Sequence, residues 1–114
     1  MRSIHGLLVC TAAFAALCAA ACTDVNTSVC ERATMCRPAS DADIEACASE
    51  LDSDEDRASI YDCDGPWDDY VHCLDDTGVC DGDRLTGCDP YQDAYHRCLE
   101  AHGAHDIHVD LRAP

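Results

Sequence analysis

Residues 63–99, CDGPWDDYVHCLDDTGVCDGDRLTGCDPYQDAYHRCL, contain the same pattern twice, at an offset of 25 residues with no gap. The matched positions are Cys63 and Cys88, Asp64 and Asp89, Asp68 and Asp93, Tyr70 and Tyr95, Cys73 and Cys98, and Leu74 and Leu99. A duplicated short unit accounts for this match, although two copies are too few for a solenoid. Two helices with matching apolar faces are expected to pack as a hairpin.

Both copies carry the signals of an amphipathic helix. In the first, Pro66 lies in the first turn, where its missing N–H has no helical partner to lose, and Gly78 is the expected end. In the second, Asp89 is the expected N-cap, Pro90 the first helical residue and Gly103 the C-terminal stop. The side chains expected between the two helices are Trp67, Tyr70, Leu74, Tyr91, Tyr95 and Leu99.

Two further helices are predicted before this hairpin. The first spans about 27–36, with Thr27 or Ser28 as its N-cap and Arg37-Pro38 as its stop. The second follows Ser40, an N-cap residue with Asp43 three positions later. Its apolar face has the spacing i, i+3, i+4, i+7 and consists of Ile44, Cys47, Ala48 and Leu51. Strand signals are nearly absent, so we expect an all-α fold: a small disulfide-stapled domain of about four short helices, the last two forming a hairpin.

The number of cysteines points to a disulfide scaffold. The chain has 11 Cys among 114 residues, a density typical of small proteins from an oxidising compartment. Beyond the N-terminal 21 residues there are one Trp, four Tyr and no Phe. Because so few large apolar side chains make a thin core, we expect the cysteines to supply much of the stability.

The charge of the chain restricts its partners. It carries 23 acidic and 7 basic residues, a formal net charge of -16, and all of the basic residues are Arg. This charge repels nucleic-acid phosphates and anionic membrane surfaces. It favours solubility and attracts cations or a basic partner. We therefore expect no nucleic-acid partner, and no sequence motif indicates a cofactor.

Residues 1–21 have the features of a signal peptide. Arg2 supplies the positive n-region, and 7–21 is an uncharged apolar run that is short for a transmembrane helix. Ala19-Ala20-Ala21 then precedes Cys22. An ordinary signal peptidase needs small residues just before the bond that it cleaves, and Ala19 and Ala21 meet this need for cleavage after Ala21. The same stretch also resembles the lipobox of bacterial lipoproteins, in which the cysteine becomes the acylated N-terminus.

The lipoprotein resemblance implies that Cys22 carries a lipid anchor. Thr23, not Asp, follows it, which in that family favours the outer membrane; otherwise the protein would be secreted or periplasmic. Cysteine parity agrees with acylation, because an even set of eight then remains for disulfides. That set is Cys30, Cys36, Cys47, Cys63, Cys73, Cys80, Cys88 and Cys98.

Nine residues separate Cys63 from Cys73, and nine separate Cys88 from Cys98. This spacing is similar to the twin Cx9C pattern of the coiled-coil-helix-coiled-coil-helix family, whose two antiparallel helices are joined outer to outer and inner to inner. The resemblance implies the pairs Cys63–Cys98 and Cys73–Cys88. Eight cysteines allow 105 connectivities, so the remaining pairs stay open.

The candidate metal ligands are histidines near the C-terminus. His102, His105 and His108 recur at every third residue and could bind Zn²⁺, Cu²⁺ or Ni²⁺; the competing interpretation is a flexible polar tail. Asp52, Asp54 and Asp56 have the spacing that opens a Ca²⁺ loop. Arg57 replaces the required Gly, however, so we interpret them as an exposed acidic turn.

No pair of residues indicates catalysis, so no catalytic residue is assigned. The expected organisation is a signal peptide at 1–21, a lipid-anchor region with the first helix at 22–39, the rest of the Cys-rich domain at 40–103 and a His/Asp tail at 104–114. The predicted function is that of a non-enzymatic, membrane-tethered, Cys-rich envelope lipoprotein that acts as a structural or interaction domain, with an unidentified protein or envelope component as its partner. A metal-binding protein and an enzyme of unidentified type are the alternatives.

Overall fold

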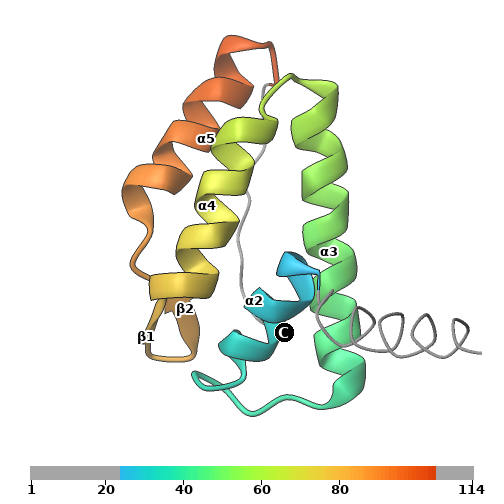
Figure 1. The fold of residues 1–114 in the computed structure, drawn as a ribbon, viewed down its shortest axis with the longest axis vertical. Helices are drawn as coiled ribbons and strands as arrows, with labels where there is room; N and C mark the ends of the chain where they lie inside the picture. Colours follow the sequence, from blue (N-terminus) through green and yellow to red (C-terminus); the bar gives the residue numbers. More distant parts are fainter. Residues whose placement is uncertain (1–23, 105–114) are drawn as a thin grey trace, which may run out of the picture.

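The computed structural model describes residues 24–104, which form four helices and one short two-stranded sheet. Their order is α2 (Val25–Ala33), α3 (Asp41–Ile60), α4 (Asp64–Thr77), β1 (Val79–Asp81), β2 (Arg84–Thr86) and α5 (Asp89–Ala101). Figure 1 shows α4 and α5 side by side, with α3 along the other side of α4 and the short α2 between the lower ends of α3 and α4. The prediction of a small, mainly helical, disulfide-stapled domain is confirmed.

The two repeat units form the predicted hairpin, α4 with α5. The residues before the two helices, Cys63 and Cys88, have nearly the same backbone angles, φ -113° and ψ 21° against φ -120° and ψ 28°. Asp89 was predicted as the N-cap, but Cys88 takes that place and Asp89 is the first helical residue. There its negative charge faces the positive end of the helix dipole.

Aromatic rings fill the space between these helices. The ring centroid of Trp67 lies 5.2 Å from that of Tyr95 and 6.2 Å from that of Tyr70. Val71, Leu74 and Leu99 complete the buried contact.

The expectation that Tyr91 is buried was wrong, because this side chain is 46% exposed. Gln92 is half-buried and lines a small cavity beside Tyr70 and Leu74. Gln92 occupies the repeat position of Trp67, 25 residues earlier. The inward face of α5 therefore differs from the predicted face at its first position, where Gln92 replaces Tyr91, while Tyr95 and Leu99 are buried as predicted.

The capping box predicted for the second helix is present at the start of α3. The Asp43 N–H donates to Ser40 Oγ at 3.3 Å, and the Ser40 N–H donates to Asp43 Oδ2 at 2.9 Å. The Ser40 Oγ also donates to Asp43 Oδ2 at 2.7 Å, and the two hydrogen bonds from Ser40 to this carboxylate lower the pKa of Asp43.

The helix then continues for 20 residues, so the acidic turn predicted at Asp52, Asp54 and Asp56 was wrong. All three lie within α3, which continues because it buries Leu51 and, two turns later, Ala58.

The first helix, α2, begins and ends earlier in the sequence than predicted: it spans Val25–Ala33, whereas the prediction was about 27–36. It begins at Val25, after Asp24, because Asn26 in its first turn is already fully buried in the domain. It ends at Ala33, after which the N–H groups of 34–36 donate three residues back, in a tighter turn.

A β-hairpin between α4 and α5 was not predicted. Its strands pair antiparallel as Val79↔Thr86, Cys80↔Leu85 and Asp81↔Arg84. Gly82, with a φ of +62°, makes the tight turn, followed by Asp83. The Gly-Asp dipeptide was the available signal, but three-residue strands are too short to show alternation.

Within 24–104, none of the helices combines the length and the apolar character needed to span a membrane.

Candidate functional site

All eight predicted disulfide cysteines are bonded, in four pairs. The two pairs that the twin Cx9C resemblance implies, Cys63–Cys98 and Cys73–Cys88, are present at the two ends of the α4–α5 hairpin. The other two pairs, which the sequence left open, are Cys30–Cys47 and Cys36–Cys80.

The four bridges join every helix to another element. Cys30–Cys47 ties α2 to α3, and Cys36–Cys80 ties the turn after α2 to strand β1. A native disulfide in a small domain typically contributes about 2–4 kcal/mol, largely by restricting the unfolded chain. The bridges therefore add covalent links both to the α4–α5 hairpin, which has an aromatic core, and to the α2 region, which buries fewer large side chains.

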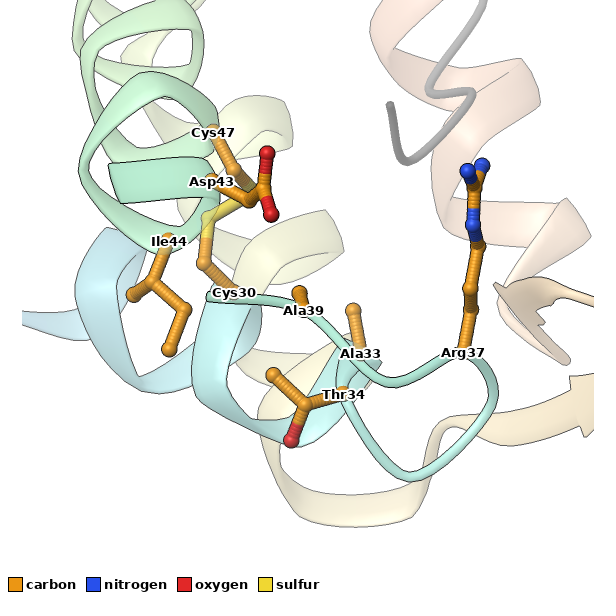
Figure 2. A pocket seen from close by; sticks show the side chains of 8 residues that line it. All are labelled: Cys30, Ala33, Thr34, Arg37, Ala39, Asp43, Ile44 and Cys47. Atoms are coloured by element: carbon orange, nitrogen blue, oxygen red, sulfur yellow. A yellow bond between two sulfur atoms is a disulfide. The ribbon is translucent and has the colours of Figure 1, made fainter. Parts of the chain in front are cut away.

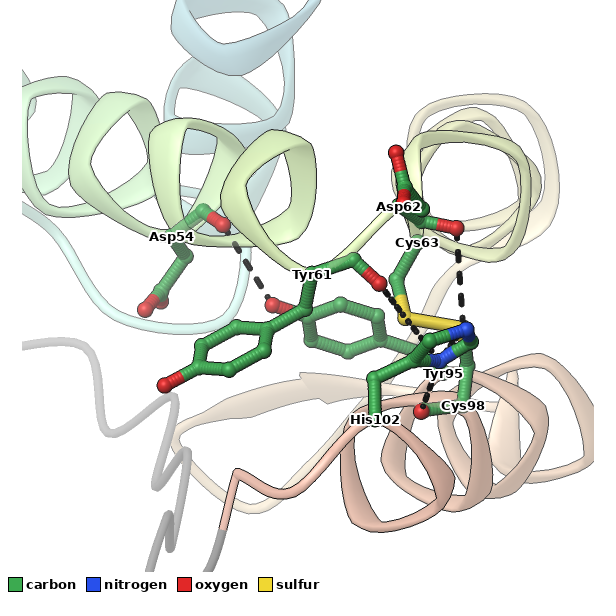
Figure 3. Close-up of a disulfide and its surroundings, with 7 residues drawn as sticks. All are labelled: Asp54, Tyr61, Asp62, Cys63, Tyr95, Cys98 and His102. Atoms are coloured by element: carbon green, nitrogen blue, oxygen red, sulfur yellow. Dashed lines mark hydrogen bonds between the residues drawn. A yellow bond between two sulfur atoms is a disulfide. The ribbon is translucent and has the colours of Figure 1, made fainter.

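Of the three candidate metal ligands, His102 is described, at the C-terminal end of α5. Its Nδ1 lies 2.8 Å from Cys98 O, and 3.8 Å and 3.7 Å from the sulfurs of Cys63 and Cys98 (Figure 3). A carbonyl oxygen only accepts, so Nδ1–H donates to it and stabilises the helix end. The imidazole thus lies against a disulfide.

Three of the predicted site residues, Cys22, His105 and His108, lie outside the described residues. The last described residue, Ala104, is buried, and its N–H donates to Leu99 O at 2.9 Å.

The sequence pattern did not predict that Asn26 is buried. Asn26 is 0% exposed, and its Nδ2 donates to Asp52 Oδ1 and to Glu55 Oε2, each at 2.8 Å. The side-chain amide of Asn26 in α2 therefore bridges the carboxylates of Asp52 and Glu55 in α3 and attaches α2 to that helix. The sequence contained a partial signal, since Asn26 and Cys30 are four residues apart on one helix face.

Two more polar side chains attach α2 to α4. Ser28 Oγ donates to Asp75 Oδ1 at 2.6 Å, and Arg32 Nη2 donates to Gly78 O at 3.1 Å. Arg32 thereby satisfies a carbonyl at the C-terminal end of α4, which has no helical donor.

The groups with raised pKa values serve the packing of the core. Burial raises the pKa of Tyr70 and of Tyr95 to about 12, and the Tyr95 hydroxyl donates to Asp54 O at 3.3 Å. Burial also raises the pKa of Asp54, against the opposing effect of Arg57, whose Nη1 lies 3.0 Å from the carboxylate. Shifted pKa values often mark active sites, but here each group has a structural partner or a place in the core.

Among the cavities lined by residues 24–104, two are small and lie between secondary-structure elements. One, of about 20 Å³, lies between α2, α3 and the connecting loop, beside the Cys30–Cys47 bridge (Figure 2). Its lining residues are Cys30, Ala33, Thr34, Arg37, Ala39, Asp43, Ile44 and Cys47. The other, of about 30 Å³, lies between α4, β2 and α5. Each has room for about one water molecule, far below the roughly 300–1,000 Å³ of small-molecule sites.

Comparison with known proteins gave no match, whether to a protein-family model, a curated protein or a solved structure. The four disulfides and the contacts described above are therefore the basis for the functional argument.

Proposed function

We propose that this protein is exported, is tethered to the cell envelope by acylation of Cys22, and acts there as a non-enzymatic interaction domain. The observation that carries the proposal is the closed pairing of the eight cysteines after Cys22. Because each of them has a partner within the domain, none is left to pair with Cys22. Cleavage before Cys22 would leave one odd thiol, and acylation consumes it.

The disulfides also support the location. Four bridges within residues 24–104 fit an oxidising extracellular or periplasmic compartment. The same bonds explain how a domain with a thin core resists unfolding outside the cell.

A lipid on Cys22 would hold the domain close to the membrane surface. Helix α2 begins at Val25, so only Thr23 and Asp24 separate it from the anchor. The three residue steps from Cys22 to Val25 span at most about 11 Å. The domain's acidic surface repels anionic headgroups, so the acyl chains, about 0.8 kcal/mol per buried methylene, would be its tether.

The proposed mode of action is binding. The three groups with raised pKa values pack or pair within the domain, and both cavities described above hold about one water molecule. The formal charge of -16 favours a partner with a basic surface and speeds the encounter with it.

The test of the tether is a comparison of Cys22→Ser with wild type by membrane fractionation and intact mass. Wild type should be membrane-bound and carry the added mass of acyl chains, whereas Cys22→Ser should be released or remain an unprocessed precursor. Cys18→Ser, a change within the leader, is the matched control and should behave as wild type. Soluble wild-type protein with an unmodified Cys22 would contradict the proposal.

A further inference from the structure

The Cys63–Cys98 bridge has a histidine against both of its sulfur atoms. His102 Nδ1 lies 3.8 Å from Cys63 Sγ and 3.7 Å from Cys98 Sγ (Figure 3). Within residues 24–104, these side chains form a group whose potential ligand atoms all lie within 4.8 Å of one another. A disulfide does not bind a metal ion well, but the two thiolates released from it would.

The two nitrogen–sulfur distances fit a tetrahedral metal site. With Zn–S near 2.3 Å and Zn–N near 2.0–2.1 Å, tetrahedral angles place N and S about 3.6 Å apart and the two sulfurs about 3.8 Å apart. Both N–S distances are therefore already within about 0.2 Å of the required value. The two sulfurs, which are bonded to each other in the disulfide, must separate, and the His102 ring must turn its Nδ1 away from Cys98 O, which lies 2.8 Å from it.

We propose that opening of the Cys63–Cys98 bridge by a dithiol reductant creates a site where both thiolates and His102 Nδ1 bind Zn²⁺ or a similar divalent ion, with water as the fourth ligand. The dithiol is oxidised to its own disulfide, and its two electrons and two protons convert the bridge into two thiols. The metal ion then displaces both thiol protons into solvent. The His102 ring moves its Nδ1 proton to Nε2, which frees Nδ1 as a ligand. This proposal is independent of the lipid anchor.

The surroundings of the bridge give access and support. His102 is exposed and Cys98 is half-buried, whereas Cys63 is 0% exposed. A reductant thiolate therefore reaches Cys98 Sγ, and Cys63 Sγ is the leaving group. Cys63 Sγ lies 3.3 Å from Tyr61 O, which can accept its S–H after reduction.

Backbone hydrogen bonds hold the ligands in place without the bridge. The Cys63 N–H donates to Ala58 O at 2.8 Å, and the His102 N–H donates to Cys98 O at 3.1 Å. The bond Cys73–Cys88 still closes the other end of the hairpin. That second bridge is also an internal control, because its described polar neighbour is the hydroxyl of Thr77, 3.4 Å from Cys73 Sγ, and not an imidazole.

The experiment is a redox titration in dithiol–disulfide buffers with and without Zn²⁺. Thiols are alkylated at each potential, and every cysteine pair is quantified by mass spectrometry. Zinc at about 100 times its Kd should favour the reduced form of Cys63–Cys98 about 100-fold, or about 59 mV for a two-electron couple. The shift for Cys73–Cys88 should be smaller. Co²⁺ in place of Zn²⁺ should give thiolate-to-metal charge-transfer absorption.

Two variants separate His102 from the other imidazoles. His102→Gln should weaken zinc binding at least about tenfold and reduce the shift accordingly. The double variant His105→Gln/His108→Gln should keep the wild-type shift. Three results would overturn the proposal: equal shifts for the two bridges, an unchanged shift in His102→Gln, or loss of the shift in the tail variant. Circular dichroism supplies a fourth test, because loss of helicity when only Cys63–Cys98 is reduced would also overturn it.

Discussion

The α4–α5 hairpin and the α2–α3 pair are both held by disulfides, but they differ in what else holds them. The hairpin buries six large side chains, namely Trp67, Tyr70, Val71, Leu74, Tyr95 and Leu99. Besides Cys30, the buried apolar side chains of α2 and α3 are Val29, Leu51 and Ala58. Polar contacts from Asn26, Ser28 and Arg32 attach α2 to its neighbours.

This difference indicates that the α2–α3 pair depends more on its disulfides than the α4–α5 hairpin does. Burial of a large apolar side chain contributes about 1.5–3 kcal/mol, whereas a typical hydrogen bond contributes a net 0.5–1.5 kcal/mol, roughly half as much. The α2 region is therefore expected to open at lower free energy than the hairpin. This unequal stability is the property that the following predictions test.

The largest effect is expected from removing the bridges in pairs. Without Cys30–Cys47 and Cys36–Cys80, α2 should lose its amide protection while α4 and α5 keep theirs. Without Cys63–Cys98 and Cys73–Cys88, the whole domain should unfold. Two bridges at about 2–4 kcal/mol each contribute about 4–8 kcal/mol, which is comparable with the total stability of a small domain. Hydrogen exchange followed by mass spectrometry of the two quadruple Cys→Ala variants checks this.

The comparison fails if both quadruple variants exchange uniformly, or if α4 and α5 open together with α2 in the first. Wild-type protein with all four bonds intact is the reference. Complete reduction of wild type should abolish helicity, since neither half then retains a staple.

The second prediction concerns the aromatic core of the hairpin. Trp67→Ala should reduce the free energy of unfolding by about 3–5 kcal/mol, because it leaves a cavity beside Tyr95. Tyr91→Ala should change it by less than about 0.5 kcal/mol, because the ring is exposed. Urea denaturation of the oxidised proteins gives both values. Similar losses in the two variants would mean that Tyr91 belongs to the core.

The third prediction concerns the polar attachment of α2. Asn26→Ala should cost about 1–3 kcal/mol, because it leaves Asp52 and Glu55 without their shared donor. Asn26→Asp should cost more, because it adds a third carboxylate between them. Urea denaturation should show that Asp52→Asn partly rescues Asn26→Asp. Equal stability of Asn26→Ala and wild type would exclude this amide as the attachment of α2.

The smallest effect is expected at the glycines of α4. Gly65 lies within the helix, and a methyl group added there would meet open space, so Gly65→Ala should stabilise the protein by about 0.4–1 kcal/mol. Gly78→Ala should destabilise it, because its Cβ would lie 2.5 Å from Leu74 O. Thermal unfolding of the two variants is enough to read the opposite signs. Stabilisation by both would show that helix propensity, and not the close contact at Gly78, decides the effect, and destabilisation by both would contradict the prediction for Gly65.

Local signals in the sequence predicted much of this fold. Ser40 with Asp43 marked the start of α3, and Pro66 and Gly78 marked the first turn and the end of α4. These signals succeed because they act within one turn of helix. The 25-residue repeat predicted a hairpin of two similar helices, and its cysteine spacing, through the twin Cx9C resemblance, implied both bridges of that hairpin.

Contacts between distant elements decided the rest. Cys36 pairs with Cys80, 44 residues away, and Asn26 is buried against α3, 26 and 29 residues away. The burial of Gln92 in place of Tyr91, and the position of His102 against the Cys63–Cys98 bridge, likewise depend on how α5 is rotated against α4. The spacing of apolar residues in the sequence shows which side chains share a helix face, because the helical repeat depends only on residues within one or two turns. Which other element covers that face depends on packing and on bonds between segments far apart in the sequence, and only the folded arrangement reveals it.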